Sequence, residues 1–509
     1  MNIVVIGGGA AGWLTALYAK KIHTEHNIIL IESEEYGILG AGEGSTPHLI
    51  QLLSFLEIPY TDLIKKCKST IKNGIKFTNW SNDGESYFHP FPSFGPASND
   101  LNYRLKDGFL ENETQFSHYC ASLKNSNTSE YSLMEKISYQ NSVPFIKNQE
   151  QKFITQFGLV AIHFNAKLLA NYLRSVGEER GIIRKEGIVK TIFNNKDGYI
   201  NKIKTDQEEI SCDFVFDCSG FRKLVIGNHY KSNWKSHSNY LPAKKAMPFF
   251  LKLDKDIPPY TEAIAMNYGW MWKIPTQDRY GCGYVFDSDY ISDEEAIKEI
   301  ENYLGFEPEY PRKEKGAFDF SAGCFENIWI KNCLSVGLSA GFLEPLEATS
   351  LTQIIFALRR FMSDKQNLYT KNNFIKKQFN SIYLNETQQI VEFLYLHYVT
   401  NKKNTKFWQD FTKNNSMPEH TSYILNVCKE KVLNNIHDFS KNTPFDIFSF
   451  YHVLIGNKII SKKDMQKNSK FILDSDKKED YKNILNEQKI IMPQFLTHNE
   501  FIDMINSEI

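Results

Sequence analysis

A glycine-rich turn between an apolar strand and a helix restricts the fold of this chain more than any other feature of its sequence. Asn2–Ile6 is apolar and β-branched, Gly7-Gly8-Gly9-Ala10-Ala11-Gly12 follows, and Trp13–Lys21 has helical character. Asn27–Ile31 predicts a second strand, which ends at Glu32, 20 residues after the last glycine of the turn. This is the G-x-G-x-x-G pattern in the strand–turn–helix context of a dinucleotide-binding fold.

Each glycine of the turn has a separate physical role. Gly7 permits the tight turn, Gly9 lets a pyrophosphate approach the backbone, and Gly12 lets the helix pack closely on the strand. The helix start offers free N–H groups to the phosphates, and the Glu32 carboxylate can accept hydrogen bonds from ribose hydroxyls. A glycine turn without a ligand is the alternative, and the motif alone does not separate FAD from NAD. The cofactor-binding residues predicted here are Gly7, Gly9, Ala10, Ala11, Gly12 and Glu32.

Two later segments favour FAD. Asp213–Gly220 and Cys333–Gly341 are strands that run into small-residue turns, and both resemble the elements with which FAD-dependent monooxygenase-like folds close around the flavin. Gly281-Cys282-Gly283 lies inside a strand-like run and opens no helix. Because no second nucleotide fold for NAD(P)H is evident, we expect electrons to arrive as reduced flavin from another protein. The predicted class is an α/β, FAD-binding, Rossmann-like flavoprotein monooxygenase fold.

Composition narrows the class of protein. Lys and Arg total 59 and Asp and Glu total 60, which argues against a nucleic-acid binder. The eight cysteines include no C-x-x-C and the 13 histidines no H-E-x-x-H, so no metal site is predicted. The N-terminal apolar run lacks a basic segment and is interrupted by glycines, unlike a signal peptide, and no run approaches the roughly 18 apolar residues of a membrane span. We therefore expect a soluble, cytoplasmic protein with reduced thiols.

The pattern of elements changes near residue 350. Before that point strands and helices alternate, with a hairpin predicted from Val189–Phe193 and Ile203–Lys204 and sheet strands from Phe249–Leu253 and Cys282–Phe286. Beyond it the periodicity is helical, over Leu351–Met362 and Phe374–Tyr398. We predict a module at residues 1–350 that binds FAD and includes interleaved, sheet-rich substrate-side segments. A mostly helical region at 351–509 is expected to cover the substrate site.

One short motif makes a family resemblance specific. Tyr268–Pro275 contains W-x-W-x-I-P, and together with the N-terminal glycine turn it closely resembles the flavin-dependent tryptophan halogenase family. Further segments follow in family order: Gly40–Pro47, which resembles the flavin strap, Lys72–Phe77, which resembles the segment with the catalytic lysine, Asp217–Arg222 and Phe342–Glu347. The resemblance covers residues 1–360 and places Gly42, Glu43, Ser45, Val189, Gly220, Gly337 and Leu338 at the flavin.

The resemblance implies that reduced FAD and oxygen convert a halide ion to hypohalous acid, which travels to a separate substrate site. There Lys72, with Lys76 as runner-up, would activate the oxidant, because an ammonium donates hydrogen bonds to the hypohalite oxygen. A solvated surface lysine is the alternative. Glu347 would stabilise the positive charge on the ring and help remove its proton. For Glu344 a structural role suffices, because we expect Pro345 to start a helix whose first turn favours acids.

The same helix start is predicted to bind the halide. Backbone N–H groups at Thr349 and Ser350 would lie near a helix N-terminus, which suits an anion. The sequence departs from the family pattern here, with Ala348 where Ser is usual and Ser350 where Gly is usual. We hypothesise that this reshaped pocket favours bromide or iodide over chloride.

Trp270 and Trp272 would form a wall on the flavin side of the substrate site that keeps organic substrate from direct hydroxylation. Their alternation in a strand means that both rings face one side. Core packing of two aromatic side chains is the alternative.

The substrate is expected to be an electron-rich small aromatic compound of the indole or phenol type. Within Tyr87–Phe91 the resemblance maps His89 and Phe91 to residues that flank the ring. The segment Phe445–Gly456 supplies Phe448 and Tyr451, but it lacks the tyrosine pair and glutamate with which the family grips free tryptophan. A separate flavin reductase is implied. Whether the substrate is carrier-bound and whether the chain forms a homo-oligomer stay open. The alternatives are an FAD-dependent aromatic hydroxylase and a non-catalytic flavin-fold binding protein.

Overall fold

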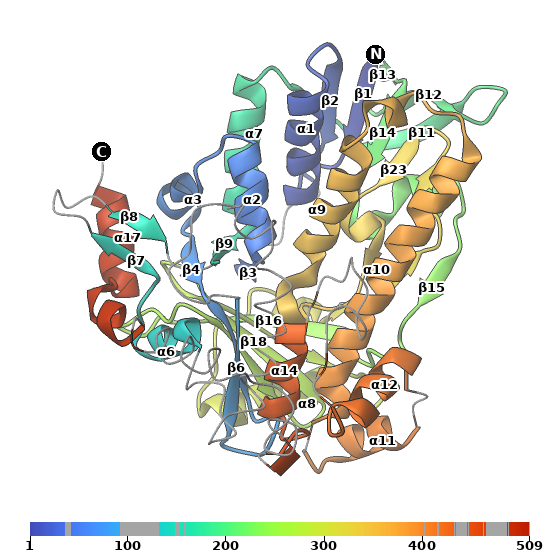
Figure 1. Ribbon diagram of the computed structural model, residues 1–509. Coiled ribbons are helices and arrows are strands. Elements are labelled where there is room, and N and C mark those ends of the chain that lie inside the picture. Colours follow the sequence, from blue (N-terminus) through green and yellow to red (C-terminus); the bar gives the residue numbers. More distant parts are fainter. Residues whose placement is uncertain are drawn as a thin grey trace. The chain divides into compact units, whose positions relative to one another are not determined.

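The computed structural model (Figure 1) describes residues 1–35, 42–91, 132–147, 153–156, 159–401, 403–414, 417–431, 433, 445, 447–461, 463–464, 486 and 488–507. Gly40 and Ala41 of the predicted strap lie outside the described residues. Contacts divide the chain into two units: unit 1 is Met1–Ser69, His163–Ser238 and Ser321–Thr387, and unit 2 is Thr70–Ile162, Asn239–Phe320 and Gln388–Ile509. The boundary predicted at residue 350 falls inside unit 1, because helix α9 (Thr349–Met362) packs against helix α1 (Ala10–Ile22).

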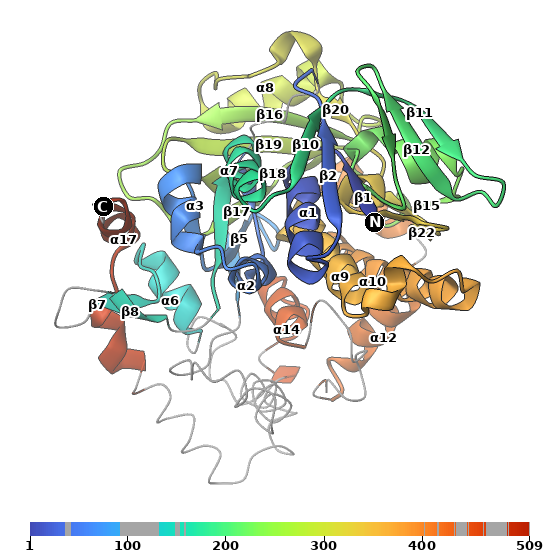
Figure 2. The ribbon, with the colours of Figure 1, turned by 90° about the horizontal axis from the view of Figure 1, so that it is seen from above.

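Unit 1 is built on a six-stranded sheet with the order β10-β2-β1-β14-β23-β22. Figure 2 shows its strands β10, β2 and β1 side by side. All neighbours are parallel except the last pair. The central strands are almost wholly apolar and buried, as expected for parallel strands covered on both faces. The bounds are β1 (Asn2–Ile6), β2 (Asn27–Glu32), β10 (Ile183–Glu186), β14 (Phe214–Asp217), β22 (Trp329–Ile330) and β23 (Cys333–Ser335). The strand, helix and strand predicted at the N-terminus are confirmed.

Helices and smaller sheets complete unit 1. Helix α1 contacts both α7 (Ala166–Glu179) and α9. Helix α7 begins where the Asn165 side chain accepts hydrogen bonds from two backbone N–H groups, a standard N-cap. The predicted hairpin is confirmed as β11 (Val189–Asn194) and β12 (Ile200–Thr205), to which β13 (Glu209–Ser211) adds a third strand. The other elements are β3 (Gly42–Gly44), α2 (Pro47–Phe55), α3 (Tyr60–Cys67), β9 (Ala161–Asn165), β15 (Trp234–Ser236), β21 (Gly323–Phe325) and β24 (Gly341–Phe342).

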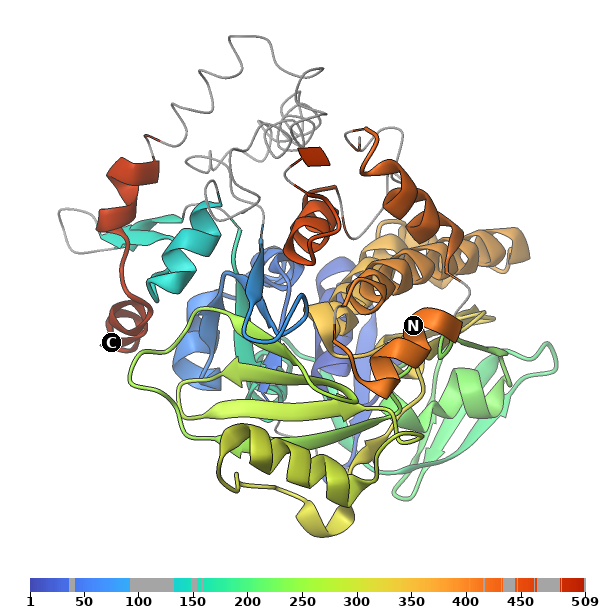
Figure 3. The same cartoon turned by 90° about the horizontal axis from the view of Figure 1, so that it is seen from below.

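Unit 2 is built on a seven-stranded sheet with the order β20-β16-β19-β18-β17-β5-β6. Helix α8 (Asp293–Leu304) packs against β16 and β19 and covers one face of the sheet (Figure 3). It begins with a capping box between Ser292 and Glu295 and ends at Gly305 in the left-handed conformation. The strands are β5 (Gly74–Thr78), β6 (Ser86–Pro90), β16 (Lys245–Leu251), β17 (Thr261–Ala265), β18 (Gly269–Pro275), β19 (Tyr280–Phe286) and β20 (Phe318–Asp319).

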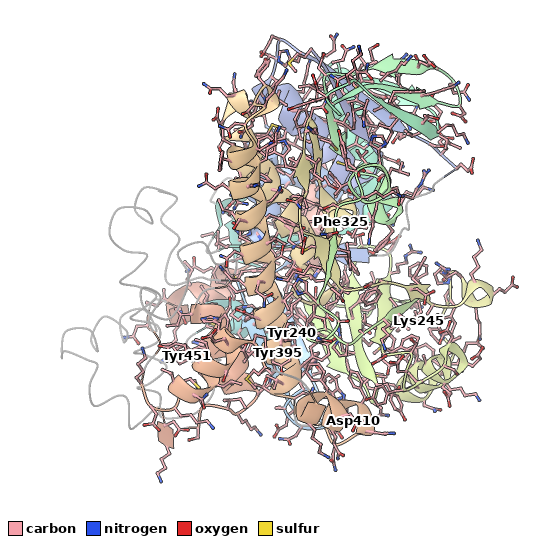
Figure 4. All side chains as sticks on the ribbon, turned by 90° about the vertical axis from the view of Figure 1, so that its right-hand side faces the viewer. Tyr240, Lys245, Phe325, Tyr395, Asp410 and Tyr451 are labelled. Atoms are coloured by element: carbon pink, nitrogen blue, oxygen red, sulfur yellow. The ribbon has the colours of Figure 1, made fainter. Side chains whose placement is uncertain are left out.

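The C-terminal part of the chain is largely helical in the residues described. Helix α10 (Asn373–Val399) confirms the predicted helix, and on its unit 2 portion Tyr395 packs edge-to-face on Tyr240 at 5.7 Å between ring centroids (Figure 4). The remaining elements of unit 2 are β4 (Thr70–Lys72), α6 (Leu133–Tyr139), β7 (Phe145–Lys147), β8 (Phe153–Gln156), α11 (Lys406–Asn414), α12 (Glu419–Val427), α14 (Ile447–Gly456) and α17 (His498–Ser507). Among the described helices, none is long and apolar enough to cross a bilayer.

Candidate functional site

The glycine turn of unit 1 contains two glycines that the backbone packing requires and one that faces open space. Gly7 has φ +116°, and a Cβ there would lie 2.2 Å from the Cys218 carbonyl oxygen. A Cβ on Gly12 would lie 1.8 Å from the Gly7 carbonyl oxygen. By contrast, a Cβ on Gly9 would meet no atom of the described residues within 4 Å. Gly7 and Gly12 are therefore required by the fold, whereas the space at Gly9 suits the close approach of a phosphate.

Glu32 lies beside the turn and is held by two arginines. Its Oε1 forms an ion pair with Arg184 and lies 3.6 Å from Arg174 Nη1. A Cβ on Gly8 would lie 1.6 Å from Glu32 Oε2, so Gly8 lets the carboxylate approach the turn. The sequence pattern did not single out Gly8 or the two arginines. The role of Glu32 toward a ribose stays a prediction.

A second open backbone position follows the neighbouring strand β14. Its last residue, Asp217, is buried and accepts hydrogen bonds from the backbone N–H groups of Val225 (2.9 Å) and Ile226 (3.1 Å). These bonds fix the turn at Gly220, which has φ +66° and, in the described part of the chain, no atom within 4 Å of a Cβ position. Because β1 and β14 are parallel neighbours, the open positions after them lie at the same edge of the sheet. This is the crevice in which open α/β sheets bind nucleotides, and the residues present fit an FAD there.

Other predicted flavin contacts lie in unit 1 as well. Gly337 has φ +76°, and a Cβ there would lie 3.0 Å from the Ala11 Cβ at the start of α1. Leu338 follows it in a short turn, and Val189 begins β11. These positions are consistent with the predicted site, and their contacts with a flavin stay a prediction.

The described part of the strap connects β9 to α9. In β3, Gly42 and Glu43 pair with β9, and Ser45 is buried. Desolvation raises the pKa of the Glu43 carboxyl to about 7. The Thr46 hydroxyl lies 2.7 Å from the Thr352 hydroxyl of α9, within hydrogen-bond distance.

The segment before α9 corrects one expectation. Pro345 does not start the helix, because Glu347 (φ +64°) and Ala348 (φ +54°) both adopt the left-handed conformation and α9 begins only at Thr349. Glu344 and Glu347 are both buried, so neither is an acid of an exposed first helical turn. Two consecutive non-glycine residues at positive φ store backbone strain, of about 1–2 kcal/mol each, and such strain clusters at functional sites.

The predicted halide-binding residues occupy the first two positions of α9. Their backbone N–H groups have no partner within the helix. The Thr349 side chain is buried, and its Oγ1 has no hydrogen-bond partner among the described residues. Ser350 lines a small recess together with Gly337 and Gln353. The helix start therefore offers uncommitted donors to an anion.

In unit 2, Lys72 is not a surface lysine. It is 1% exposed, and its Nζ lies 5.5 Å from the centroid of the Phe91 ring, a cation–π distance. The Phe91 N–H donates a hydrogen bond of 2.9 Å to the carbonyl of Asn73, the residue after Lys72. This bond holds Phe91 beside the backbone that carries Lys72. The solvated-lysine alternative is wrong.

Lys76 has a different environment. It lies on β5 opposite Glu262 of β17, and the two side chains form an ion pair at 3.1 Å. Glu262 also accepts a hydrogen bond from the Thr78 hydroxyl at 2.6 Å. Lys76 is thus committed to a sheet contact, which favours Lys72 as the reactive lysine.

His498, which the sequence analysis did not select, holds the strand that carries Lys72. Its Nε2 accepts a hydrogen bond from the Ile71 N–H at 2.9 Å, and its Nδ1–H donates one to the Ile257 carbonyl at 3.0 Å. Because Nε2 accepts the Ile71 N–H, it carries no proton and the ring is neutral, and burial lowers the pKa of His498 to about 4. No local pattern could have identified it, because Ile71 and His498 are 427 residues apart.

The two tryptophans of W-x-W-x-I-P face one side of the unit 2 sheet, as predicted. The ring centroids of Trp270 and Trp272 are 6.3 Å apart, and both side chains are buried. The strand β19 accommodates them with a glycine, because a Cβ on Gly283 would lie 2.1 Å from Trp272 Cη2. Their role as a wall beside the flavin stays a prediction.

The predicted substrate residues enter a cluster of aromatic rings. The His89 ring lies 6.5 Å from Phe445 and 6.1 Å from His452 between centroids, and Phe448 packs on His452 at 4.6 Å. The structure thus brings His89 close to Phe445 and His452, and a role of these residues toward a substrate stays a prediction. The Tyr451 hydroxyl, however, accepts a hydrogen bond from the Leu433 N–H at 3.1 Å, which is a structural bond that the sequence did not predict.

Comparisons with known proteins identify the family of the chain. Residues 2–471 match the family model described as tryptophan halogenase. The chain is 29% identical over 479 residues to tryptophan 6-halogenase SttH of Streptomyces toxytricini, covering 90% of each chain. It is 28% identical over 422 residues to tryptophan 7-halogenase RebH of Lentzea aerocolonigenes, covering 80% of this chain and 78% of that protein.

Solved structures of halogenases have the same fold as this chain. A tryptophan halogenase from Shewanella frigidimarina NCIMB 400 superposes with a TM-score of 0.85 at 26% identity, over 100% of this chain and 98% of that chain. Xcc4156, a flavin-dependent halogenase from Xanthomonas campestris, superposes with a TM-score of 0.85 at 24% identity, over 99% and 98%.

Proposed function

Because the chain belongs to the tryptophan halogenase family, we propose that it halogenates an electron-rich small aromatic compound of the indole or phenol type, with Lys72 as the activating group and Glu347 as the proton acceptor. Membership of the family itself gives the reaction class, the fold and the cofactors. The chain is a flavin-dependent halogenase with an α/β FAD-binding fold, and its cofactors are FADH2 and a halide ion. The family implies an aromatic substrate and a separate flavin reductase.

When bound, FADH2 supplies, together with oxygen, the oxidation of a halide ion to hypohalous acid. The residues proposed to hold this cofactor are those at the open positions Gly9 and Gly220, with Glu32 and Gly337 beside them. The halide is proposed to bind at Thr349 and Ser350. The Thr349 hydroxyl, which has no hydrogen-bond partner among the described residues, and two helix-terminal N–H groups supply the donors.

The observation that carries the proposal is the burial of Lys72 beside Phe91. An ammonium in a desolvated setting is a strong hydrogen-bond donor. Toward hypohalous acid, Lys72 donates to the oxygen, and the O–X bond breaks with its electron pair left on that oxygen, which takes up a proton and leaves as water. The halogen bonds to a ring carbon. The proton of that carbon passes to the Glu347 carboxylate, which restores the aromatic ring.

The finer substrate and halide assignments rest on departures from the family pattern. The aromatic cluster of His89, Phe445 and Phe448 supports a flat, electron-rich ring, and the Tyr451 hydroxyl is already engaged by a backbone N–H. This supports an indole or phenol rather than the amino-acid end of free tryptophan. Ala348 and Ser350 support a preference for bromide or iodide.

Mass spectrometry of products tests the proposal directly. A panel of indoles and phenols is incubated with the enzyme, FAD, a flavin reductase, NADH and equimolar chloride, bromide and iodide. Lys72→Met is expected to lower halogenated product by roughly 100-fold or more, the usual effect of removing a catalytic acid. The matched control Lys76→Met removes only an ion pair with Glu262, worth about 0.2–1 kcal/mol, and is expected to retain activity.

Three results would count against parts of the proposal. Equal activity of Lys72→Met and Lys76→Met would remove Lys72 from the mechanism. Exclusive chlorination would refute the halide preference. Oxygen addition to the substrate in the absence of halide would support the hydroxylase alternative.

A further inference from the structure

Three lysines of unit 1 surround one tyrosine ring away from the residues discussed so far. The Nζ atoms of Lys331, Lys376 and Lys371 lie 5.2, 5.5 and 5.6 Å from the centroid of the Tyr199 ring. In the part of the chain that the structure describes, none of the three forms an ion pair with a carboxylate. Each ring contact is weakly favourable, but three like charges around one ring repel one another.

Of the three lysines, Lys376 has the environment that is hardest to explain without a bound ligand. It is 4% exposed, and its Nζ has no hydrogen-bond partner among the described residues. It lies in the first turn of α10, where the helix dipole disfavours a cation. Burial and the Lys331 charge both lower its pKa. A buried ammonium without a partner is strongly destabilising, so this position calls for an anion.

A second unpaired donor lies beside it. The Lys376 Nζ is 5.8 Å from the centroid of the Trp329 ring. Trp329 is buried, and its Nε1–H has no acceptor among the described residues. Two neighbouring buried donors that both lack an acceptor indicate a ligand that offers only acceptors.

The donors are held in place by the backbone around them. The Asn380 side chain, one turn after Lys376, accepts hydrogen bonds from the backbone N–H groups of Ile328 (3.1 Å) and Trp329 (3.0 Å) and so fixes α10 against β22. The Asn332 side chain, next to Lys331, donates to the carbonyls of Ile200 (2.7 Å) and Asp213 (2.8 Å). The backbone segments that carry Lys376, Trp329 and Lys331 are therefore held in place, which lowers the cost of ordering a ligand there.

The lysine cluster also lies apart from the dinucleotide crevice. Lys331 comes just before β23, and the Asn332 bond to Asp213 places it at the amino end of β14. The open glycines of the crevice follow the carboxyl ends of β1 and β14. The two sites lie at opposite ends of the same sheet, so an FAD in the crevice leaves the cluster available.

We propose that Lys331, Lys371 and Lys376 form a second anion site of this enzyme and bind a phosphate-class oxyanion, either free inorganic phosphate or the phosphate group of a nucleotide. A carboxylate carries a single charge, whereas a phosphate carries about −1.5 to −2 at neutral pH and offers several acceptor oxygens. Of the two groups, only a phosphate has a negative charge that approaches the positive charge of three ammonium groups. It also has an oxygen left to accept a hydrogen bond from the Trp329 Nε1–H.

The test uses the FAD-loaded enzyme, so that the dinucleotide crevice is filled. Binding of inorganic phosphate and, separately, of AMP is measured by titration calorimetry at constant ionic strength, and melting temperature is recorded at each concentration. Lys376→Met replaces the buried ammonium with an apolar chain of similar length. Lys377→Met, an exposed neighbour on the same helix, is the matched control. Lys331→Asn is a second variant, because Asn tolerates the positive φ of 52° at that position.

The expected result is saturable phosphate binding that weakens at least tenfold in Lys376→Met and in Lys331→Asn but not in Lys377→Met. Without phosphate, Lys376→Met is expected to melt at the same temperature as the parent or higher, since it removes an unpaired buried charge. AMP binding at least tenfold tighter than phosphate identifies a nucleotide as the source, and equal affinity identifies free phosphate. Absence of saturable binding, or equal weakening by Lys376→Met and Lys377→Met, overturns the proposal.

Discussion

The substitution Gly9→Ala is expected to weaken FAD binding while it leaves the fold stable, and the structure gives the expected size of both effects. Among the residues that the structure describes, none has an atom within 4 Å of a Cβ placed at Gly9, and the backbone there (φ −74°, ψ −179°) is one that alanine adopts readily. Alanine is a poorer N-cap than glycine, but it also restricts the unfolded chain. These effects oppose each other, so the free energy of unfolding without FAD should change by less than about 1 kcal/mol.

The effect on FAD should be larger. The new methyl group would occupy the space proposed for the pyrophosphate beside the N–H groups at the start of α1. Loss of one charge-assisted hydrogen bond is worth about 1.5–3 kcal/mol, which corresponds to roughly 10- to 100-fold weaker binding. FAD affinity is measured by quenching of flavin fluorescence, and stability by urea unfolding of the FAD-free protein.

Gly12→Ala is the matched control from the same turn. Its Cβ would lie 1.8 Å from the Gly7 carbonyl oxygen, so it should destabilise the FAD-free protein by about 1–3 kcal/mol. If Gly9→Ala binds FAD as tightly as the parent, the pyrophosphate does not lie against Gly9. If it destabilises the FAD-free protein as much as Gly12→Ala, the space at Gly9 is not open.

Two further predictions concern unit 2. The pKa of His498 is about 4 in the folded protein, against an ordinary value of 6.5. Between these two pH values the unfolded chain therefore binds a proton at His498 that the folded protein does not bind. The free energy of unfolding should fall as the pH falls through this range, by about 3 kcal/mol from His498. Urea unfolding across this range should show that the fall is smaller by this amount in His498→Gln, while His48 and His237, whose pKa values burial also lowers to about 4, keep their own contribution. An unchanged fall in the variant would contradict the assignment. Gly283→Ala should destabilise the protein by about 1–3 kcal/mol through its contact with Trp272, and Trp272→Leu should relieve that effect in the double variant. Additive losses in thermal or urea unfolding would show that the two residues do not interact.

Features set by local pattern were predictable from the sequence. The β1–α1–β2 order follows from apolar runs around a glycine turn, and the shared face of Trp270 and Trp272 follows from the two-residue period of a strand. Lys72 was selected through the family motif alone. Its burial, which distinguishes it from the ion-paired Lys76, is a property of packing that no local pattern contains.

Features set by distant contacts were not predictable. Pro345 suggested a helix start, but the chain turns through Glu347 and Ala348 at positive φ before α9 begins. Only surrounding structure can hold such residues there. The bond from Ile71 to His498 joins residues at opposite ends of the chain. The domain boundary at 350 was likewise inferred from periodicity, whereas the units are defined by which segments contact one another.

The interleaving of the two units constrains how the protein is made. Unit 1 gains its last segment only at residues 321–387, so the strand β23 that completes the parallel core is synthesised long after β1 and β2. Unit 2 depends on His498 to secure β4, which left the ribosome more than 400 residues earlier. Neither unit can finish folding while the chain is short, and their apolar strands must wait for late segments. Efficient production should therefore depend on protection of the nascent chain, for example by chaperones, and excision of either unit as a contiguous fragment should fail.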